Sequence, residues 1–388
     1  MNTATPPASR LLRKARPLGG DRPEEQRKRA IRVMIVDDSL TVRTIFRRMV
    51  ESDPAMEVTA TASSGERAIA LVKSTPIDVV LLDLEMPGIG GLAALPSILE
   101  EGGNLQVLVV SSLTDDGAEA TLEALSTGAA DTMLKPRPGG FNEDYRSQLL
   151  GKIRALGGIS DKQASADFSA AKAAVPAKAS EDAAPAKTPE VIAIGASTGG
   201  IHALNLMLRA FTPELTLPIL ITQHLPASFI PVFARQVETA SGRPTHIAEE
   251  GTEIRPGEIA IATGHGHMVV RRVGGRLITR TSSEPARSGC LPSVDPMLTS
   301  LAETCDGHVL AIILSGMGRD GIVGAQDVVK AGGAIWAQNA ETSAVWGMPG
   351  AVTKAGLTRF TASPEHLGSA VMSQFAGEAD SNAAAEPI

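Results

Sequence analysis

One serine of this chain has the sequence context of a nucleophile. Ser197 lies in the stretch VIAIGASTGG (191–200), in which residues 195–199 spell G-x-S-x-G. That pattern is typical of a sharp strand-to-helix turn that exposes a nucleophilic serine above a sheet. A phosphate-binding loop is the alternative, but the dinucleotide fingerprint requires G-x-G-x-x-G and an acidic residue about 20 positions further on. The stretch around Ser197 has neither, so the sequence favours the nucleophile.

A nucleophilic serine needs a base within hydrogen-bond reach and a third group that orients the base. Of the seven histidines, His224 directly ends an apolar run, LPILITQH, just as Ser197 follows another such run. Asp320 lies in a glycine-rich turn after a third run, VLAIILSG. Because parallel strands have their carboxyl ends at one edge of a sheet, we expect Ser197, His224 and Asp320 to meet there as a catalytic triad.

Four other residues fit these roles less well. Asp295 and Asp306 are rival acids, but neither directly follows a long apolar strand. His265 and His267 form the sequence GHGH, which suggests a metal site. Two histidines without a nearby carboxylate or cysteine are a weak metal pattern, so we interpret them as loop residues near the mouth of the site.

A second set of chemical groups lies in the N-terminal half. Asp37 and Asp38 follow the first apolar run, Asp83 ends the third, and Lys135 follows the fifth. In a doubly wound sheet these strand ends are neighbours, so three carboxylates converge on one crevice with one ammonium group nearby. Oxygen ligands of this kind suit Mg²⁺, which also accepts phosphate oxygens. One carboxylate could then accept a phosphoryl group as an acyl phosphate.

The elements that must position these groups alternate in both halves of the chain. In the first half, five short apolar runs, such as VVLLDL, alternate with stretches of helical periodicity. Runs that are apolar on successive residues indicate strands covered on both faces. They predict a flavodoxin-like domain with a five-stranded parallel sheet. The second half predicts a doubly wound α/β domain, with a small antiparallel hairpin element in residues 257–280.

Changes in composition divide the 388 residues into five segments. The Ala/Lys/Pro-rich segment over residues 151–189 has few residues that could be buried, and its prolines prevent one long helix. It is therefore predicted to be a linker. An electrostatic role for the basic N-terminal tail remains an alternative to simple disorder. The predicted segments are a disordered basic tail over 1–29, a first domain over 30–150, a linker over 151–189, a second domain over 190–376 and a disordered tail over 377–388.

The composition argues against several classes of protein. The net charge is −7 and only 3% of residues are aromatic, which disfavours nucleic-acid binding. The chain has no apolar stretch long enough to cross a bilayer and no apolar core of a secretion signal, so we expect a cytoplasmic protein without membrane insertion. Cys290 and Cys305 are too few for a disulfide framework and lack metal-site spacing, so they receive no functional assignment.

Several motifs together resemble known families. The pair DD after the first strand, D-x-x-M-P-G at 83–88, a hydroxyl residue after the fourth strand and KP after the fifth resemble the receiver domain of bacterial response regulators. The stretches IGASTGG, ITQHLP, PSVDPM, ILSGMGRDG and AQNAETSAVWGMPGA resemble successive motifs of the chemotaxis protein-glutamate methylesterases, the CheB family. The segments that resemble the receiver, the linker and the effector follow each other in this family's order.

The receiver resemblance assigns roles to five residues. It implies that Asp83 is the phosphoacceptor, that Asp37 and Asp38 hold Mg²⁺ together with Asp83, and that Ser111 and Lys135 contact the phosphoryl group. It also implies a sensor histidine kinase of the CheA type as phosphodonor. In this family the receiver obstructs the active site of the effector until it is phosphorylated.

The effector resemblance implies a serine esterase that hydrolyses glutamate methyl esters on methyl-accepting chemotaxis receptors and deamidates receptor glutamines, without a cofactor. The backbone N–H of Thr198 and, by resemblance, that of Met317 would stabilise the oxyanion. Leu291 departs from the family pattern, in which an arginine is expected before PSVD, and this bears on substrate preference. Two alternatives stay open, namely a non-catalytic regulator with the same fold and an esterase that serves a parallel motility or biofilm pathway.

Overall fold

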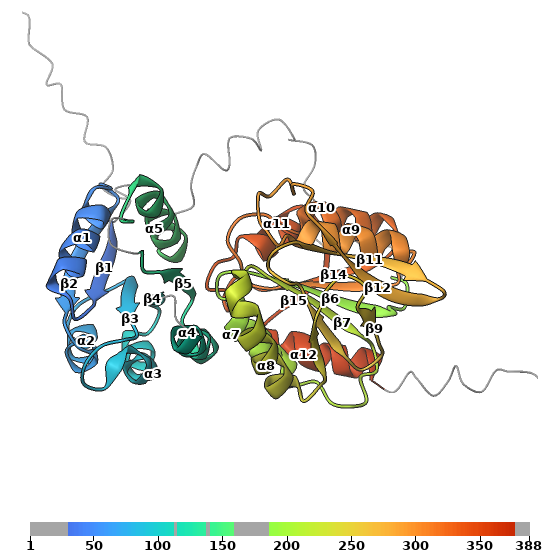
Figure 1. Ribbon diagram of the computed structural model, residues 1–388, viewed down its shortest axis with the longest axis horizontal. Helices are drawn as coiled ribbons and strands as arrows, with labels where there is room; N and C mark the ends of the chain where they lie inside the picture. Colours follow the sequence, from blue (N-terminus) through green and yellow to red (C-terminus); the bar gives the residue numbers. More distant parts are fainter. Residues whose placement is uncertain (1–29, 112–114, 137–139, 159–185, 377–388) are drawn as a thin grey trace, which may run out of the picture.

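The computed structural model describes residues 30–111, 115–136, 140–158 and 186–376, which form two α/β domains (Figure 1). The tails predicted over residues 1–29 and 377–388 lie outside the described residues, and so does most of the predicted linker. Among the helices that the structure describes, none is both long and apolar enough to span a membrane.

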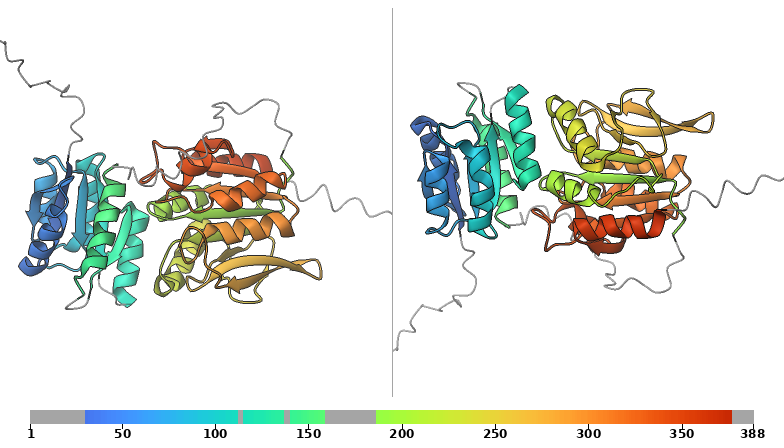
Figure 2. Two further views of the ribbon diagram at one scale, coloured as in Figure 1. Left: turned by 90° about the horizontal axis from the view of Figure 1, so that it is seen from above. Right: turned by 90° about the horizontal axis from the view of Figure 1, so that it is seen from below.

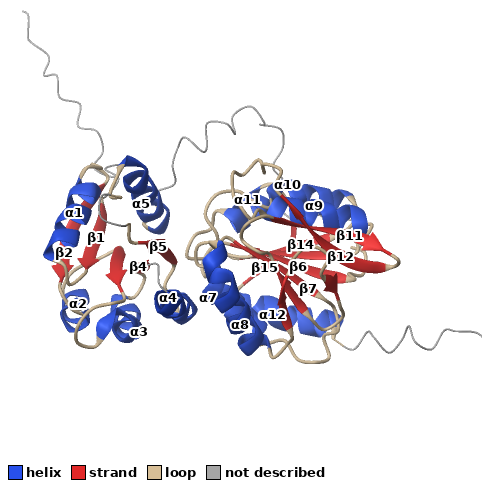
Figure 3. Ribbon diagram, viewed as in Figure 1, coloured by secondary structure: helices blue, strands red, loops and turns tan. Residues whose placement is uncertain are grey.

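The N-terminal domain is a five-stranded parallel sheet in the order β2-β1-β3-β4-β5. This confirms the predicted flavodoxin-like fold. Helices cover both faces of the sheet (Figure 3), and the two apolar clusters on these faces include the α1 and α5 side chains on one side and the α2, α3 and α4 side chains on the other. The elements are β1 (Ile31–Val36), α1 (Leu40–Glu51), β2 (Met56–Ala62), α2 (Gly65–Val72), β3 (Val79–Asp83), α3 (Gly90–Gly102), β4 (Gln106–Ser111), α4 (Asp115–Thr127), β5 (Asp131–Leu134) and α5 (Glu143–Leu156).

Helix α5 continues past residue 150, at which the sequence places the end of the first domain. Its buried residues Leu149, Ile153 and Leu156 belong to the apolar cluster on one face of the sheet. Because two of these three side chains lie beyond residue 150, packing on the sheet extends the helix into the segment that was predicted to be linker.

The C-terminal domain contains a seven-stranded parallel sheet in the order β15-β14-β13-β6-β7-β10-β8 and a small antiparallel sheet, β11-β12-β9. The predicted α/β class with a small antiparallel element is therefore confirmed. The elements are β6 (Val191–Ala196), α7 (Gly200–Leu208), β7 (Ile219–Gln223), η3 (Ala227–Phe229), α8 (Ile230–Ser241), β8 (Thr245–Ile247), β9 (Glu253–Ile254), β10 (Ile259–Ile261), β11 (His267–Val273), β12 (Arg276–Ser282), α9 (Val294–Thr304), β13 (Val309–Ile313), α10 (Ile322–Lys330), β14 (Ala334–Gln338), α11 (Met348–Lys354), β15 (Thr358–Ala362) and α12 (Pro364–Phe375).

The segment predicted as hairpin structure divides between the two sheets. Its first part forms β10, which pairs in parallel with β7 and β8 in the main sheet. The remainder forms the hairpin β11–β12, joined through Gly274 and Gly275, which both have positive φ angles (57° and 81°). Two residues with positive φ are what a two-residue type I′ turn requires, and glycine adopts them without strain.

Each parallel sheet has a point at which its strand order reverses. In the N-terminal sheet, β1 lies between β2 and β3, and in the C-terminal sheet, β6 lies between β13 and β7. Ligand sites of open α/β sheets lie beyond the carboxyl ends of the strands at such points. Asp37 and Asp83 follow or end β1 and β3, while Ser197 and Asp320 lie in the loops after β6 and β13, so each domain has its chemical groups where this rule places them.

Candidate active site

The turn after β6 brings Ser197 to the edge of the sheet. All residues of β6 are buried, and the Ser197 N–H donates to the Ser315 carbonyl at 3.0 Å. Gly199 has a φ of 75°, and a Cβ atom there would lie 2.6 Å from Ala344 Cβ and 2.7 Å from Ser315 Oγ. Only glycine fits both this left-handed conformation and this close approach, so the turn that presents Ser197 requires glycine at position 199.

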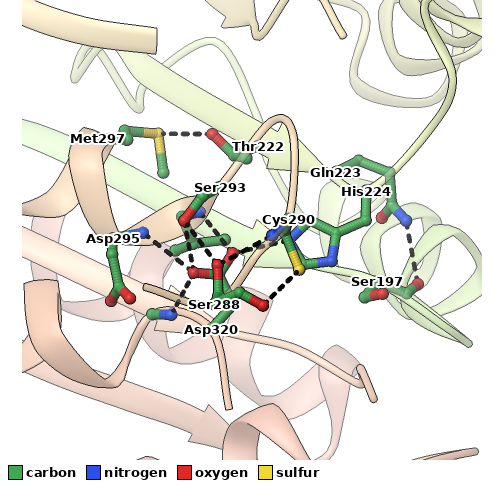
Figure 4. Close-up of polar contacts among 12 residues, drawn as sticks. Ser197, Thr222, Gln223, His224, Ser288, Cys290, Ser293, Asp295, Met297 and Asp320 are labelled. Atoms are coloured by element: carbon green, nitrogen blue, oxygen red, sulfur yellow. Dashed lines mark hydrogen bonds and ion pairs between the residues drawn. The ribbon is translucent and has the colours of Figure 1, made fainter. Parts of the chain in front are cut away.

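His224 and Asp320 form a direct pair in this site (Figure 4). Nε2 of His224 lies 2.7 Å from Oδ2 of Asp320. His224 directly follows β7, and Asp320 lies in the loop after β13 and is 1% exposed. Because Nε2 faces the carboxylate, Nδ1 is the ring nitrogen left to accept a proton from another group.

Backbone and side-chain donors fix the Asp320 carboxylate from several sides. Oδ1 accepts hydrogen bonds from Ser293 Oγ at 2.6 Å and from the Gly321 N–H at 3.0 Å, and Oδ2 accepts one from the Val294 N–H at 2.7 Å. Ser293 in turn donates its N–H to Nδ1 of His267 at 3.0 Å. Residues at the start of α9 therefore hold Asp320 in place, and Asp320 in turn orients the imidazole of His224. Sequence reasoning missed Ser293, although it lies within the quoted motif PSVDPM.

The charges of the pair stabilise each other. Burial lowers the pKa of His224, but hydrogen bonds to Asp320 and Cys290 outweigh this effect and raise it to about 9. Burial alone would raise the pKa of Asp320, whereas the hydrogen bond to His224 holds it below its ordinary value. Asp320 thus remains an anion at neutral pH and favours the protonated imidazole that forms when His224 takes up a proton.

Ser197 and His224 line the same cavity, which has a volume of about 330 Å³. Among the contacts of the described residues, the Ser197 hydroxyl has no hydrogen-bond partner, while its carbonyl accepts from Gln223 Nε2 at 3.0 Å. Catalytic hydrogen bonds are often loose before substrate binds. The structure thus brings Ser197 and His224 to the same cavity, and of the three proposed triad residues only His224 and Asp320 are directly hydrogen-bonded among the described contacts.

The two predicted oxyanion donors lie in the loops after β6 and β13. Thr198 is the next residue in the turn, and its carbonyl accepts from Ser315 Oγ at 2.8 Å. Met317 is exposed and follows Gly316, where a Cβ atom would lie 2.9 Å from Ser197 Cβ. Glycine at position 316 therefore lets the loop after β13 pass directly beside the serine.

The rival residues have other environments. Asp295 accepts a hydrogen bond from the Gly324 N–H at 2.9 Å, and burial together with the nearby Asp320 charge raises its pKa to about 6. Asp306 is exposed and pairs with Lys187 at 3.0 Å. His265 is exposed, but His267 lies in β11 and is buried, so the expectation that it is a loop residue was wrong.

Cys290 lies next to the catalytic pair, a position that its sequence did not indicate. Its sulfur, one nitrogen of His224 and one carboxylate oxygen of Asp320 all lie within 4.8 Å of one another. The thiol also contributes to the raised pKa of His224. The other cysteine, Cys305, is buried, and burial raises its pKa to about 12. Only Cys290 therefore has a chemical environment that connects it to the site.

The acidic crevice of the N-terminal domain contains the predicted groups. Nζ of Lys135 lies 2.6 Å from Oδ2 of Asp83 and 2.9 Å from Oδ2 of Asp37. Burial raises the pKa of Asp83 above its ordinary value, and Lys135 offsets only part of this rise. Asp37, Asp38 and Asp83 each bring one carboxylate oxygen within 4.8 Å of the others. One ammonium group against three carboxylates leaves excess negative charge, which fits a divalent cation with oxygen ligands.

Ser111 lies at the end of β4 and is buried. Its hydroxyl accepts a hydrogen bond from Thr121 Oγ1 at 2.7 Å, which links the end of β4 to α4. Ser112, the other hydroxyl residue at this strand end, lies outside the described residues.

Residues of the N-terminal domain form one wall of the cavity that contains Ser197. Oγ1 of Thr198 donates to Oδ2 of Asp131 at 2.6 Å, and the Gly199 N–H donates to the Ala130 carbonyl at 2.5 Å. Asp131 is also paired with Lys152 at 2.5 Å. The start of β5 therefore binds the nucleophile turn itself, and the cavity beside Ser197 lies between the two domains.

A second group of contacts joins α4 to the helices α7 and α8, which lie beside it (Figure 2). Nδ1 of His202 lies 2.9 Å from the Ser126 carbonyl, and Asn205 Nδ2 donates to Ser126 Oγ at 3.0 Å. Ser126 Oγ donates to Gln236 at 3.1 Å. His202 thus takes part in the contact between the domains and not in the triad.

Fold and site together define a response regulator whose receiver domain is joined to an enzymatic α/β domain. A family model for the response regulator receiver domain matches residues 33–140, and one for CheB methylesterase matches residues 192–371. A protein-glutamate methylesterase/protein-glutamine glutaminase of Rhodopseudomonas palustris (strain HaA2) is 39% identical in a match over 368 residues that covers 90% of this chain and 95% of the relative. The chain belongs to the CheB methylesterase family, and the resemblance inferred from its motifs is confirmed.

Two further comparisons describe the extent of this similarity. A protein-glutamate methylesterase/protein-glutamine glutaminase of Rhodospirillum rubrum is 40% identical over 351 residues, covering 84% of this chain and 90% of the relative. The crystal structure of the Thermotoga maritima CheB methylesterase catalytic domain is 29% identical, with a TM-score of 0.47, and covers 48% of this chain and 98% of that chain.

Proposed function

We propose that this chain is a Ser-His-Asp esterase that hydrolyses glutamate methyl esters on methyl-accepting chemotaxis receptors in the cytoplasm, and that phosphorylation of its receiver activates it. The observation that carries the catalytic assignment is the His224–Asp320 pair at 2.7 Å, since His224 lines the same cavity as Ser197. A non-catalytic regulator would not need an ion pair of this kind beside a serine turn.

In the proposed reaction, Nδ1 of His224 takes the proton of Ser197, and Oγ attacks the carbonyl carbon of the methyl ester. The backbone N–H groups of Thr198 and Met317 stabilise the oxyanion, at about 3 kcal/mol per donor. The bond to the methoxy oxygen then breaks, and the imidazolium proton leaves with methanol. Water gives a proton to His224 and attacks the acyl group, which releases glutamate and restores Ser197. The same steps on a glutamine amide release ammonia.

The direct test of this function is to mix the protein with a methylated receptor and to measure methanol. Release of methanol separates an esterase from a regulator that acts by binding alone. Comparing receptors from swimming and from surface-motility pathways then identifies which methyl esters are substrates.

Control of this activity is assigned to the receiver. Asp83 would accept the phosphoryl group from a CheA-type histidine kinase, and Asp37, Asp38 and Asp83 would hold Mg²⁺, which neutralises charge on that group when bound. Lys135 and Ser111 would contact the phosphoryl oxygens. The contact of Asp131 with Thr198 supports obstruction of the site by the unphosphorylated receiver, since a two-state domain interface can be biased by one new charged group.

Replacing Asp83 by asparagine is expected to remove this control. Acetyl phosphate should raise the methanol-release rate of the unaltered protein about tenfold, which corresponds to a coupling free energy of about 1.4 kcal/mol. It should leave the rate of Asp83→Asn unchanged. Asparagine has no carboxylate oxygen that could form an acyl phosphate. Asp38→Asn, which keeps the acceptor, should retain a response at higher Mg²⁺. An unchanged response in Asp83→Asn would reject the assignment.

Replacing Asp131 by alanine is expected to raise the basal rate about tenfold, because the interface loses a hydrogen bond to a charged acceptor, worth about 1.5–3 kcal/mol. Stimulation by acetyl phosphate should shrink by a similar factor. Asp144→Ala is the control, since Asp144 is an exposed acid of the same domain on α5. A basal rate equal to that of the control would show that this contact does not obstruct the site.

A further inference from the structure

The catalytic pair has a third neighbour that the proposed reaction does not use. Cys290 lies in the loop before α9, and its side chain is partly exposed. Its sulfur lies within 4.8 Å of a ring nitrogen of His224 and of a carboxylate oxygen of Asp320 (Figure 4). The structure thus brings a thiol, an imidazole and a carboxylate together at one point.

These three groups are the ligands that zinc prefers. Catalytic zinc sites use three protein ligands from Cys, His and Asp or Glu and leave a fourth position for water. Mg²⁺ and Ca²⁺ select oxygen ligands and bind thiolate weakly. We propose that Cys290, His224 and Asp320 form a zinc-binding site, and that the bound ion reversibly inhibits the esterase.

The surroundings of the three ligands favour such a site. Hydrogen bonds from Ser293, Val294 and Gly321 hold the Asp320 carboxylate, as outer-shell donors do in zinc proteins. Tetrahedral zinc would place the donor atoms about 3.5 Å from one another, given bond lengths of about 2.0–2.3 Å. Zinc on Nε2 would therefore replace the 2.7 Å hydrogen bond between His224 and Asp320, while Cys290, which lies outside helices and strands, would approach by a movement of its loop.

Inhibition follows from the ligand role of His224. Zinc on Nδ1 would occupy the lone pair that takes up the proton of Ser197, and zinc on Nε2 would leave the ring proton on Nδ1, which then could not accept another. In either case His224 could not act as the general base or pass a proton to the leaving group. The effect on the esterase rests on the proposed role of His224, whereas the binding of zinc does not. The two parts of the inference can therefore be tested separately.

Binding is tested with Co²⁺ as a spectroscopic probe, in the full chain with excess Mg²⁺ to occupy the oxygen-only site of the receiver. A thiolate-to-cobalt absorption band in the near ultraviolet is expected, together with visible bands of tetrahedral Co²⁺, and Zn²⁺ should abolish both. Cys290→Ser should lose the thiolate band. Cys305→Ser is the matched control and should keep it, and so should Ser197→Ala, because Ser197 is not a ligand. Absence of the band in the unaltered protein, or its loss in Cys305→Ser, would overturn the site.

Inhibition is tested by titrating methanol release with Zn²⁺ and adding a chelator to restore it. Each variant is normalised to its own zinc-free rate. Cys290→Ser and Cys290→Ala are expected to raise the half-inhibiting zinc concentration at least about tenfold. Equal inhibition of these variants would overturn the proposal. If no variant releases methanol but the cobalt band behaves as expected, the zinc site stands and the esterase assignment fails.

Discussion

Alanine in place of Ser197 is expected to lower the rate of methanol release from a methylated receptor by about a millionfold. Removing the nucleophile of a triad costs about this factor, because the base and the acid act only through the serine, and the oxyanion hole and substrate binding alone retain about 10³–10⁴-fold catalysis over water. Ser197 is not buried and its hydroxyl has no hydrogen-bond partner among the described residues, so its removal should leave the folded state intact.

The matched control for this variant is Ser369→Ala, which removes an exposed hydroxyl on α12. Both variants should have the same melting temperature as the unaltered chain. Methanol release within about tenfold of normal in Ser197→Ala would exclude the serine as nucleophile. The site would then have to act through another group near His224.

Asp320→Asn is expected to have the second large effect and to lower the rate of methanol release about ten-thousandfold. An amide nitrogen facing Nε2 of His224 would donate a hydrogen bond to it and force the proton of the neutral ring onto Nδ1. That nitrogen could then no longer accept the proton of Ser197. The measurement is kcat with saturating receptor.

Asp295→Asn is the control for this prediction, because it changes another buried acid, which lies in the first turn of α9. The Asp295 carboxylate accepts from the Gly324 N–H and does not pair with His224, so we expect less than about a tenfold change in kcat. Since Asp320 accepts several hydrogen bonds, the stability of Asp320→Asn is checked by its melting temperature. If both variants are folded and lose kcat to a similar extent, the assignment of Asp320 as the triad acid is wrong.

The fold was predictable because buried parallel strands leave an unambiguous pattern. Runs such as those of β3 and β13 are apolar on successive residues, and every residue in them is buried. Helix α5 was not predicted, since its buried residues are concentrated in its second half. The division of residues 257–280 between two sheets was missed because short apolar runs do not reveal which strand they will pair with.

The candidate site was predictable where its residues follow strands, since the carboxyl ends of parallel strands converge. His224 and Asp320 illustrate this rule. Ser293 and Cys290 could not be placed in this way, because both come from the segment before α9, whose path depends on tertiary packing. Asp131 could not be placed either, because its contact with Thr198 depends on how two separately folded domains meet.

The volume of the cavity in front of Ser197 has a consequence for how the enzyme would be assayed. A space of about 330 Å³ admits an ester of a few atoms, whereas a helix with its side chains is about 10–12 Å across and cannot enter. The resting enzyme should therefore discriminate by size, cleaving small soluble esters while a helical protein substrate stays outside. An assay with a small chromogenic ester would then report the chemistry of Ser197 and overlook the receiver's control.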